Sequence, residues 1–196
     1  NPLINAGAIA VSSLLTTLIS FDDFLDKVRS LCKNPKISCN DSVYASEFAH
    51  SERNHSLAWE LKRMKLLVGD LDESLRFYTR SCAINVCARD LAVFASTLAS
   101  GGIDCDTGER VISKSAVRIA KSLMFTCGLY DGSGEFAVRV GLPAKSGVGG
   151  GILAVVNHRL GIGAFGPSLD RNGNSIGSIL ILEYLSEKFG WHIFSH

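Results

Sequence analysis

The sequence predicts an α+β fold with a helical region first, then antiparallel sheet strands and a C-terminal helix. Apolar residues recur at helical spacing over roughly the first two-thirds of the 196 residues. The pattern then changes to short alternating or continuous apolar runs, which are typical of strands, before helical spacing returns near the end. Helices followed by an antiparallel sheet indicate the α+β class. No linker or low-complexity segment divides the chain, so we expect one domain over residues 1–196.

Six helices are expected before the pattern changes. They span residues 6–19, 22–34, 47–64, 72–78, 86–99 and 114–124. The second should stop at Asn34, because the proline that follows disfavours helical backbone in the residue before it. The fifth should end at Gly101 and Gly102, since glycine is the commonest residue just beyond a helix C-terminus. Ser113 is the expected N-cap of the sixth helix.

The last third of the chain predicts strands and a covering helix. The expected strands span residues 136–142, 151–156 and 160–165. The first alternates between apolar and other side chains, as a half-buried strand does, whereas the second is continuously apolar, as in a central strand. A turn at residues 157–159 should reverse the chain between the second and third strands. The final helix should follow residues 173–175 and run through Phe189.

The composition excludes several classes of protein. A net charge of +1 provides no general attraction for nucleic acid or for an anionic membrane. No apolar run approaches the roughly 20 residues that span a bilayer, and the first residues do not resemble a signal peptide. The six cysteines contain no Cys-x-x-Cys pair, and the five histidines are not at metal-ligand spacing. We therefore expect a cytoplasmic protein with free thiols, no metal and no cofactor.

The segment Lys145-Ser146-Gly147-Val148 is the most informative motif. A Lys-[Ser/Thr]-Gly triplet lines the active site of penicillin-recognising serine enzymes. The glycines that follow do not match a phosphate-binding loop, because the residue before the lysine is not glycine and a strand follows. They indicate a bulged strand, or backbone N–H groups that form an oxyanion hole, or both.

Several polar residues have two interpretations each. Tyr130 lies in a turn-prone segment where its hydroxyl could transfer protons, but both it and Tyr78 could be half-buried packing residues. Glu47 and Asn54 are seven residues apart, on one face of the predicted helix, where they could bind an amino acid. The alternative is a solvated helix face. Asn5 is either a helix N-cap or an amide within a pocket.

A Ser-x-x-Lys motif is present at Ser30-Leu31-Cys32-Lys33. Such a pair can supply a nucleophilic serine and a lysine that activates it. Four-residue matches with two free positions arise often by chance, and this one lies at the basic end of a predicted helix. We interpret it as a chance match.

Together these segments resemble the serine-dependent glutaminases, an amidase family with a β-lactamase/transpeptidase-like fold. The matching segments follow the family's order and comprise residues 1–8, 46–54, 78–102, 124–136, 141–156, 167 and 169–175. The resemblance implies an enzyme that converts L-glutamine to L-glutamate and ammonia through an acyl-enzyme. We expect no cofactor and a homo-oligomer. Asn157 departs from the family, which usually has a proline there.

The resemblance also implies roles for individual residues. Those matching the residues that bind the α-amino and α-carboxylate groups of glutamine are Asn5, Glu47, Asn54 and Tyr78. Among them, Glu47 is the natural partner of the ammonium. Tyr130 matches a tyrosine that transfers protons beside the nucleophile. Val148 matches the residue whose backbone N–H helps to form the oxyanion hole.

In the family, the Ser-x-x-Lys pair precedes the segment that corresponds to residues 1–8, whereas Ser30 and Lys33 follow it. We therefore expect this chain to be an N-terminally incomplete catalytic domain, and to be inactive when isolated. One alternative function is a non-catalytic or regulatory fragment that binds glutamine or glutamate. A second alternative is a penicillin-recognising acyl-serine enzyme.

Overall fold

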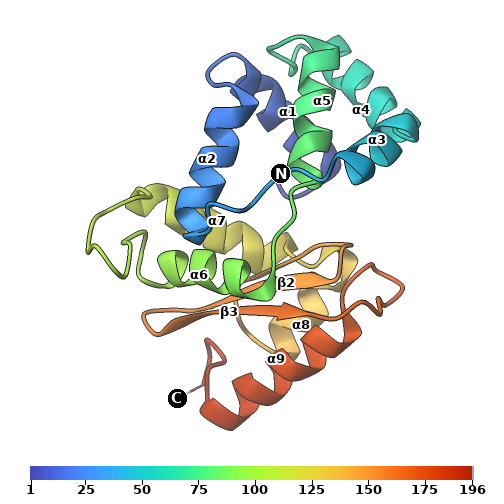
Figure 1. Ribbon diagram of the computed structural model, residues 1–196. Coiled ribbons are helices and arrows are strands. Elements are labelled where there is room, and N and C mark those ends of the chain that lie inside the picture. Colours follow the sequence, from blue (N-terminus) through green and yellow to red (C-terminus); the bar gives the residue numbers. More distant parts are fainter. Residues whose placement is uncertain (196) are drawn as a thin grey trace. The chain divides into compact units, whose positions relative to one another are not determined.

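The computed structural model describes residues 1–195 and divides into two compact units (Figure 1). The helical unit comprises Asn1–Ser30 and Asn34–Val86. The sheet unit comprises Leu31–Lys33 and the chain from Cys87 onward. Among the described residues, no single helix has the length and apolar composition of a membrane span. The first two helices meet those criteria only as a pair, with a bend of 112° between them.

The helical unit contains five helices. They are α1 (Asn5–Thr16), α2 (Phe21–Cys32), α3 (Asp41–Ala49), α4 (Glu52–Arg63) and α5 (Leu71–Cys82). Buried apolar side chains from α1, α4 and α5 form its core, namely Ile9, Ala58, Leu71 and Leu75. The Asp70 carboxylate accepts a hydrogen bond from the Glu73 N–H at 3.0 Å and caps the start of α5. The predicted helix over 72–78 is thus confirmed, and it is longer than the sequence indicated.

The single helix predicted over residues 47–64 is two helices, α3 and α4. Ser51 is buried at the break, and its hydroxyl donates to the Phe48 carbonyl at 2.6 Å. A serine hydroxyl that satisfies a nearby carbonyl competes with the continuing helix, which explains the interruption. Glu47 therefore lies on α3 and Asn54 on α4, so the prediction that they share one helical face is wrong.

The sheet unit contains an antiparallel sheet in the order β1-β2-β3. Its elements are α6 (Ala88–Ala99), α7 (Lys114–Cys127), a 3-10 turn (Tyr130–Gly132), α8 (Ser133–Arg139), β1 (Ala144–Ser146), β2 (Gly151–Val156), β3 (Leu160–Phe165) and α9 (Ile176–Phe189). Strands β2 and β3 coincide with two of the predicted strands, and β1 contains the Lys-Ser part of the motif. The α+β class and the covering C-terminal helix are confirmed.

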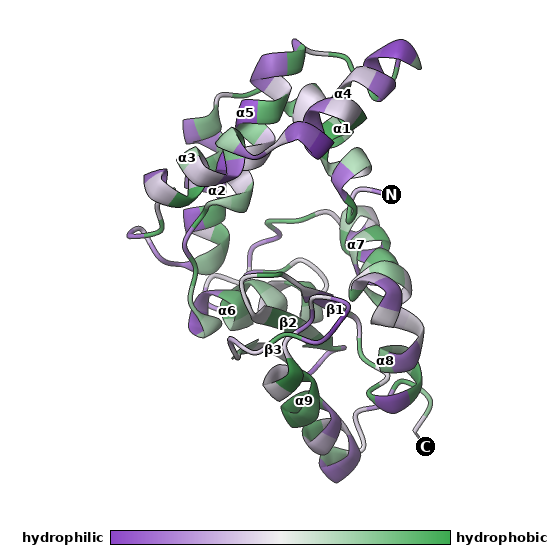
Figure 2. Cartoon of the chain, turned by 90° about the vertical axis from the view of Figure 1, so that its right-hand side faces the viewer, coloured by the Kyte–Doolittle hydropathy of each residue, from purple (hydrophilic) through white to green (hydrophobic). Residues whose placement is uncertain are grey.

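Helices cover both faces of this sheet, with α6 on one face and α8 and α9 on the other (Figure 1). On the α8 and α9 face, Phe136 and Leu182 pack with Ile152 and Ala154 of β2. Figure 2 shows hydrophobic residues along much of the first half of α9 and hydrophilic residues at its end. The sheet unit is thus a three-layer arrangement whose core contains β2.

The predicted strand over residues 136–142 is wrong, because most of this segment is the helix α8. Phe136 and Val140 are buried and Val138 is 79% exposed. Residues four apart share a helical face, so the same apolar residues that alternate along a strand also form one buried helical stripe when the middle residue faces outward. The helical conformation therefore buries Phe136 and Val140 together.

Several predicted helix ends are confirmed. The Ser113 hydroxyl accepts a hydrogen bond from the Ala116 N–H at 3.2 Å and caps α7. After α6, Gly101 and Gly102 have positive φ angles of 74° and 91°, a backbone conformation that other residues rarely adopt. The predicted turn between β2 and β3 is also present, with a φ of 58° at His158.

Gly163 allows α6 to approach β3, and its replacement should destabilise the sheet unit. A Cβ atom at Gly163 would lie 1.9 Å from the Ala88 carbonyl oxygen. We expect Gly163→Ala to lower the free energy of unfolding by about 3 kcal/mol, because backbone must shift to admit the methyl group. Gly177→Ala on α9 is the matched control, since its Cβ would meet nothing within 4 Å. Equal denaturant midpoints for the two variants would contradict this account.

Candidate active site

The predicted site residues divide between the two units. Asn5, Glu47, Asn54 and Tyr78 belong to the helical unit. Tyr130 and Val148 belong to the sheet unit. Each group has a distinct local geometry within its own unit.

In the helical unit, Asn5 and Asn54 are in direct contact although 49 residues separate them. The Asn5 side-chain N–H donates to the Asn54 side-chain oxygen at 3.0 Å. Asn5 is the first residue of α1, whose N-cap position is Ile4, so the alternative of Asn5 as an N-cap is wrong. The contact leaves an oxygen on Asn5 and an NH₂ group on Asn54, which can accept from an ammonium and donate to a carboxylate.

Glu47 is exposed on α3, and its side chain forms no ion pair or hydrogen bond within residues 1–195. An uncompensated carboxylate of this kind is suited to bind a ligand cation. Tyr78 lies on α5, half-buried, and packs against the core cluster that includes Ile9 and Leu75. The packing interpretation of Tyr78 is therefore confirmed for its ring, and this packing fixes where the ring lies.

In the sheet unit, Tyr130 has a φ of 53°, which is rare for a residue with a side chain. Two neighbouring side chains hold this backbone. The Ser133 hydroxyl accepts from the Leu129 N–H at 2.9 Å and donates to the Tyr130 carbonyl at 2.8 Å. The buried Asn174 amide donates to the Leu129 carbonyl at 3.1 Å. Backbone strain that the surroundings enforce in this way is frequent at functional sites.

Lys145 and Gly173 lie next to Tyr130. The Lys145 ammonium is 4.9 Å from the centre of the Tyr130 ring, and it also donates to the Ser146 carbonyl. A Cβ atom at Gly173 would lie 3.4 Å from Val148 and 3.8 Å from Tyr130. The fold thus brings the Lys-Ser-Gly strand, the tyrosine and the loop before α9 to one place. The Lys-Ser-Gly motif draws attention to Lys145, but its contact with Tyr130 and the contacts of Gly173 and Asn174 depend on the fold and could not be predicted.

Val148 lies in the turn of the β1–β2 hairpin, so the prediction of a bulged strand is wrong. The Gly150 N–H donates to the Gly147 carbonyl at 2.9 Å and closes the turn. Gly150 has a φ of 90°, and its Cβ would lie 2.5 Å from the Gly166 carbonyl oxygen, so glycine is required there. The Val148 N–H donates to no acceptor among the described residues. It is therefore available to stabilise a negative charge.

The Ser30 and Lys33 pair has a structural explanation. The Lys33 ammonium lies 2.6 Å from a carboxylate oxygen of Asp104 and also contacts Asp106. The hydrogen bonds that Lys33 donates, first to Asp104 and then to Asp106, hold the pKa of Lys33 above its ordinary value, whereas a lysine base needs a lowered pKa. Ser30 is exposed near the end of α2. This geometry supports the interpretation of the motif as a chance match.

No group of three or more metal-binding side chains occurs within residues 1–195. The six cysteines are free thiols, and Cys32 is buried. Burial raises the pKa of the Cys32 thiol to about 11, so this sulfur is protonated at neutral pH and is a poor nucleophile.

Comparisons with known proteins give the same family over nearly the whole chain. The family description "Glutaminase" matches residues 1–194. The glutaminase of Alkaliphilus metalliredigens is 43% identical over 99% of this chain and 65% of its own length. The glutaminase of Clostridium tetani is 46% identical over 99% of this chain and 64% of its own length. The chain thus spans slightly less than two-thirds of the curated relatives that it matches.

Solved structures share the fold. The Bacillus subtilis glutaminase YbgJ, in covalent complex with 5-oxo-L-norleucine, superposes with a TM-score of 0.94 at 34% identity, over 99% of this chain and 70% of that one. The protein Mglu in its glutamate form superposes with a TM-score of 0.92 at 39% identity, over 98% of this chain and 45% of that one. With a family match over residues 1–194, this chain belongs to the glutaminase family.

Proposed function

We propose that the protein containing this sequence hydrolyses L-glutamine to L-glutamate and ammonia. The observation that carries the proposal is the family match over residues 1–194. It is supported by YbgJ, which reacts with the glutamine analogue 6-diazo-5-oxo-L-norleucine, and by the glutamate form of Mglu. We also propose that residues 1–196 are one incomplete catalytic domain of the β-lactamase/transpeptidase-like fold, in a cytoplasmic homo-oligomer.

The amino-acid end of glutamine is assigned to the helical unit. Glu47 forms an ion pair with the substrate ammonium, and its lack of a protein partner supports this role. The Asn5 and Asn54 amides, already joined to each other, present the remaining oxygen and NH₂ groups to the ammonium and α-carboxylate. The half-buried Tyr78 donates its hydroxyl hydrogen bond to the carboxylate from a fixed ring position.

The amide end of glutamine is assigned to the sheet unit and to a serine that precedes Asn1. The serine oxygen attacks the side-chain amide carbon, and its proton passes to a lysine base. The carbonyl oxygen becomes negative and accepts a hydrogen bond from the Val148 N–H, which no protein acceptor uses in the described residues. Tyr130 donates a proton to the departing nitrogen, so ammonia leaves and an ester forms. Water then adds to the ester carbon, and the serine oxygen leaves with one of the water protons, which releases L-glutamate. The lysine passes its extra proton to the Tyr130 phenolate, so that the serine, the lysine and Tyr130 return to their starting states.

The Lys145 ammonium beside the Tyr130 ring favours this proton transfer. A positive charge 4.9 Å from the ring centre stabilises the phenolate that remains after Tyr130 gives up its proton. Lys145 thereby acts through Tyr130 in this mechanism.

Covalent labelling of the full-length protein tests the proposed function. Incubation with 6-diazo-5-oxo-L-norleucine should add one 5-oxo-L-norleucine group per chain, measured by intact-protein mass spectrometry. Excess L-glutamine should slow the labelling, because both compounds use one site. A folded full-length protein that remains unlabelled would refute the proposal, and acylation by a penicillin instead would establish a different amide-cleaving enzyme.

The Ser30→Ala variant should retain its activity. Because Lys33 is paired with Asp104 and Asp106, it cannot serve Ser30 as a base, and we expect kcat to change by less than about twofold. Ammonia release from L-glutamine by the full-length variant measures this. Loss of activity with unchanged thermal stability would make Ser30 the nucleophile and overturn the chance-match interpretation.

A further inference from the structure

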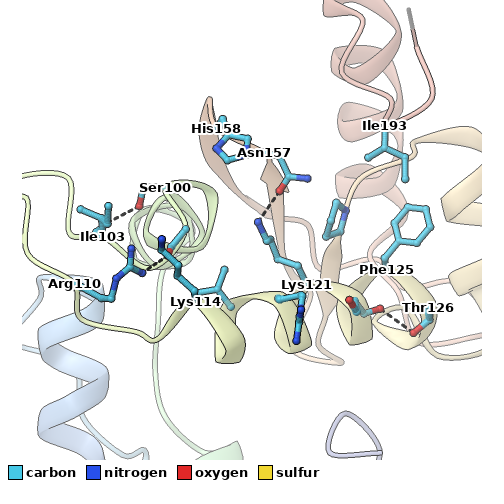
Figure 3. Close-up of a pocket in the computed structure, with 15 residues that line it drawn as sticks. Ser100, Ile103, Arg110, Lys114, Lys121, Phe125, Thr126, Asn157, His158 and Ile193 are labelled. Carbon is cyan, nitrogen blue, oxygen red and sulfur yellow. Dashed lines mark hydrogen bonds between the residues drawn. The ribbon is translucent and has the colours of Figure 1, made fainter.

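The sheet unit contains a cleft of about 780 Å³, and none of the predicted site residues line it. The cleft lies between α7, the end of α6 with the loop after it, the turn after β2 and the C-terminal segment (Figure 3). Its volume is in the range of sites that bind small molecules. It is therefore a second candidate site, and it does not depend on the proposed function.

Four basic side chains line this cleft, and no aspartate or glutamate does. The cations are Arg110, Lys114, Arg118 and Lys121. No ion pair within residues 1–195 involves any of the four. The whole chain balances 20 basic residues against 19 acidic ones, so the positive charge of the cleft results from placement rather than composition. An uncompensated positive cleft concentrates anions.

The arrangement on α7 is unfavourable for the helix itself. Lys114, Arg118 and Lys121 follow one another at helical spacings of four and three, where like charges repel by a few tenths of a kcal/mol per pair. The first turn of α7 contains no acidic residue, although the N-terminal end of a helix favours negative charge. Helix stability does not explain these residues, whereas a bound anion would offset both effects.

Lys121 lies near the middle of the cleft (Figure 3). Its ammonium donates to the side-chain oxygen of Asn157 at 2.9 Å, across from α7 to the turn after β2 (Figure 3). Burial lowers the pKa of Lys121, and the neutral amide of Asn157 does not neutralise its charge.

The cleft has a charged end and an apolar end. Figure 3 shows Arg110 and Lys114 toward one end, Lys121 near the middle, and Phe125 and Ile193 toward the other. Val117 and Pro143 also contribute apolar atoms to the lining of the cleft. Such a surface suits a ligand that is charged at one end and apolar at the other.

We propose that this cleft binds a small organic phosphate, with the phosphate group held by the cations and a ring-sized apolar body against the opposite wall. A phosphate monoester carries close to two negative charges at neutral pH and three acceptor oxygens. Arg118 offers a planar pair of donors, and Arg110 offers the N–H groups that remain after its Nη1 donates to the Gly101 and Ile112 carbonyls. Lys114 and Lys121 offer point charges, so several donors can meet several phosphate oxygens. A single carboxylate would leave most of these cations without a partner.

Phenyl phosphate is a suitable probe, because it has one phosphate and one aromatic ring. When phenyl phosphate is titrated into the full-length protein at low ionic strength, calorimetry should show saturable binding that weakens as salt is added. Inorganic phosphate should compete for the same site but bind at least about tenfold more weakly, and phenol should not bind detectably. Saturable binding of phenol, or no binding of phenyl phosphate, would overturn the proposal.

Matched variants locate the binding. Arg118→Gln removes one charged donor from the cleft and should weaken phenyl phosphate binding at least about tenfold. Arg89→Gln removes an exposed charge on α6 outside the cleft and should leave the affinity within about twofold. Thermal melting verifies that both variants are folded. An equal loss of affinity in the two variants would reduce the binding to general charge attraction and would refute the site.

A third variant separates this cleft from the proposed glutamine site. Glu47 belongs to the helical unit and does not line the cleft. Glu47→Ala should therefore impair glutamine binding but leave phenyl phosphate binding unchanged. If Glu47→Ala weakens phenyl phosphate binding as much as Arg118→Gln does, the probe occupies the glutamine site and the proposal fails.

Discussion

Replacing Glu47 with alanine should abolish measurable glutaminase activity at ordinary substrate concentrations. The carboxylate is the proposed partner of the substrate ammonium, and it has no ion-pair partner among the described residues. Removing one member of a charged, hydrogen-bonded pair leaves the other charge without compensation, so we expect the KM for L-glutamine to rise at least about thirtyfold. Steady-state ammonia release by the full-length protein measures this change.

Two companion variants separate charge from stability in this experiment. Glu47→Gln keeps the shape but not the charge and should behave like Glu47→Ala. Glu52→Ala removes an exposed carboxylate at the start of α4 and should change KM by less than about twofold. A normal KM in Glu47→Ala would remove this residue from substrate binding.

Tyr130→Phe should lower kcat by about a hundredfold or more with little change in KM, because it removes only the hydroxyl that transfers protons. The aromatic ring is retained, so the Lys145 ammonium keeps its contact with the ring face. The strained backbone at residue 130 is held by Ser133 and Asn174 and should also persist. The expected loss is therefore chemical rather than structural.

Tyr184→Phe is the matched control for this substitution. Tyr184 lies on α9 with its side chain 58% exposed, and its hydroxyl accepts a hydrogen bond from Lys188 at 3.1 Å. Its loss should leave kcat within about twofold. If Tyr130→Phe retains full kcat while both variants melt at the wild-type temperature, Tyr130 is not the proton donor.

Much of the helix content and the sheet could be predicted from local sequence signals. The Ser113 cap, the glycines after α6 and the continuous apolar run of β2 each specify their structure through neighbouring residues. Such signals act over a few residues, so a single sequence contains them in full.

The errors arose where two local structures bury the same side chains. Phe136 and Val140 fit the alternation of a strand, but four-residue spacing also fits a helix, and packing against β2 and α9 decides between them. The break between α3 and α4 depends on the hydroxyl of Ser51, whose hydrogen bond to Phe48 is invisible in a pattern of apolar residues. Tertiary context thus decided both cases.

The contacts of the candidate site were less predictable still. Asn5 and Asn54 meet across 49 residues, and no periodicity links two helices that distant in the chain. The approach of Gly173 to Tyr130 and Val148 likewise depends on how the loop before α9 folds back. The sequence identified candidate residues through their resemblance to a family, while the distances between them required the fold.

The most direct test of the account is the rate at which the full-length protein releases ammonia from L-glutamine. Ammonia and L-glutamate should form in equal amounts, and Glu47→Ala should remove this activity while Glu52→Ala retains it. A folded full-length protein that binds L-glutamine but releases neither product would contradict the proposed enzymatic function, and would favour a protein of the glutaminase family that binds glutamine without cleaving it.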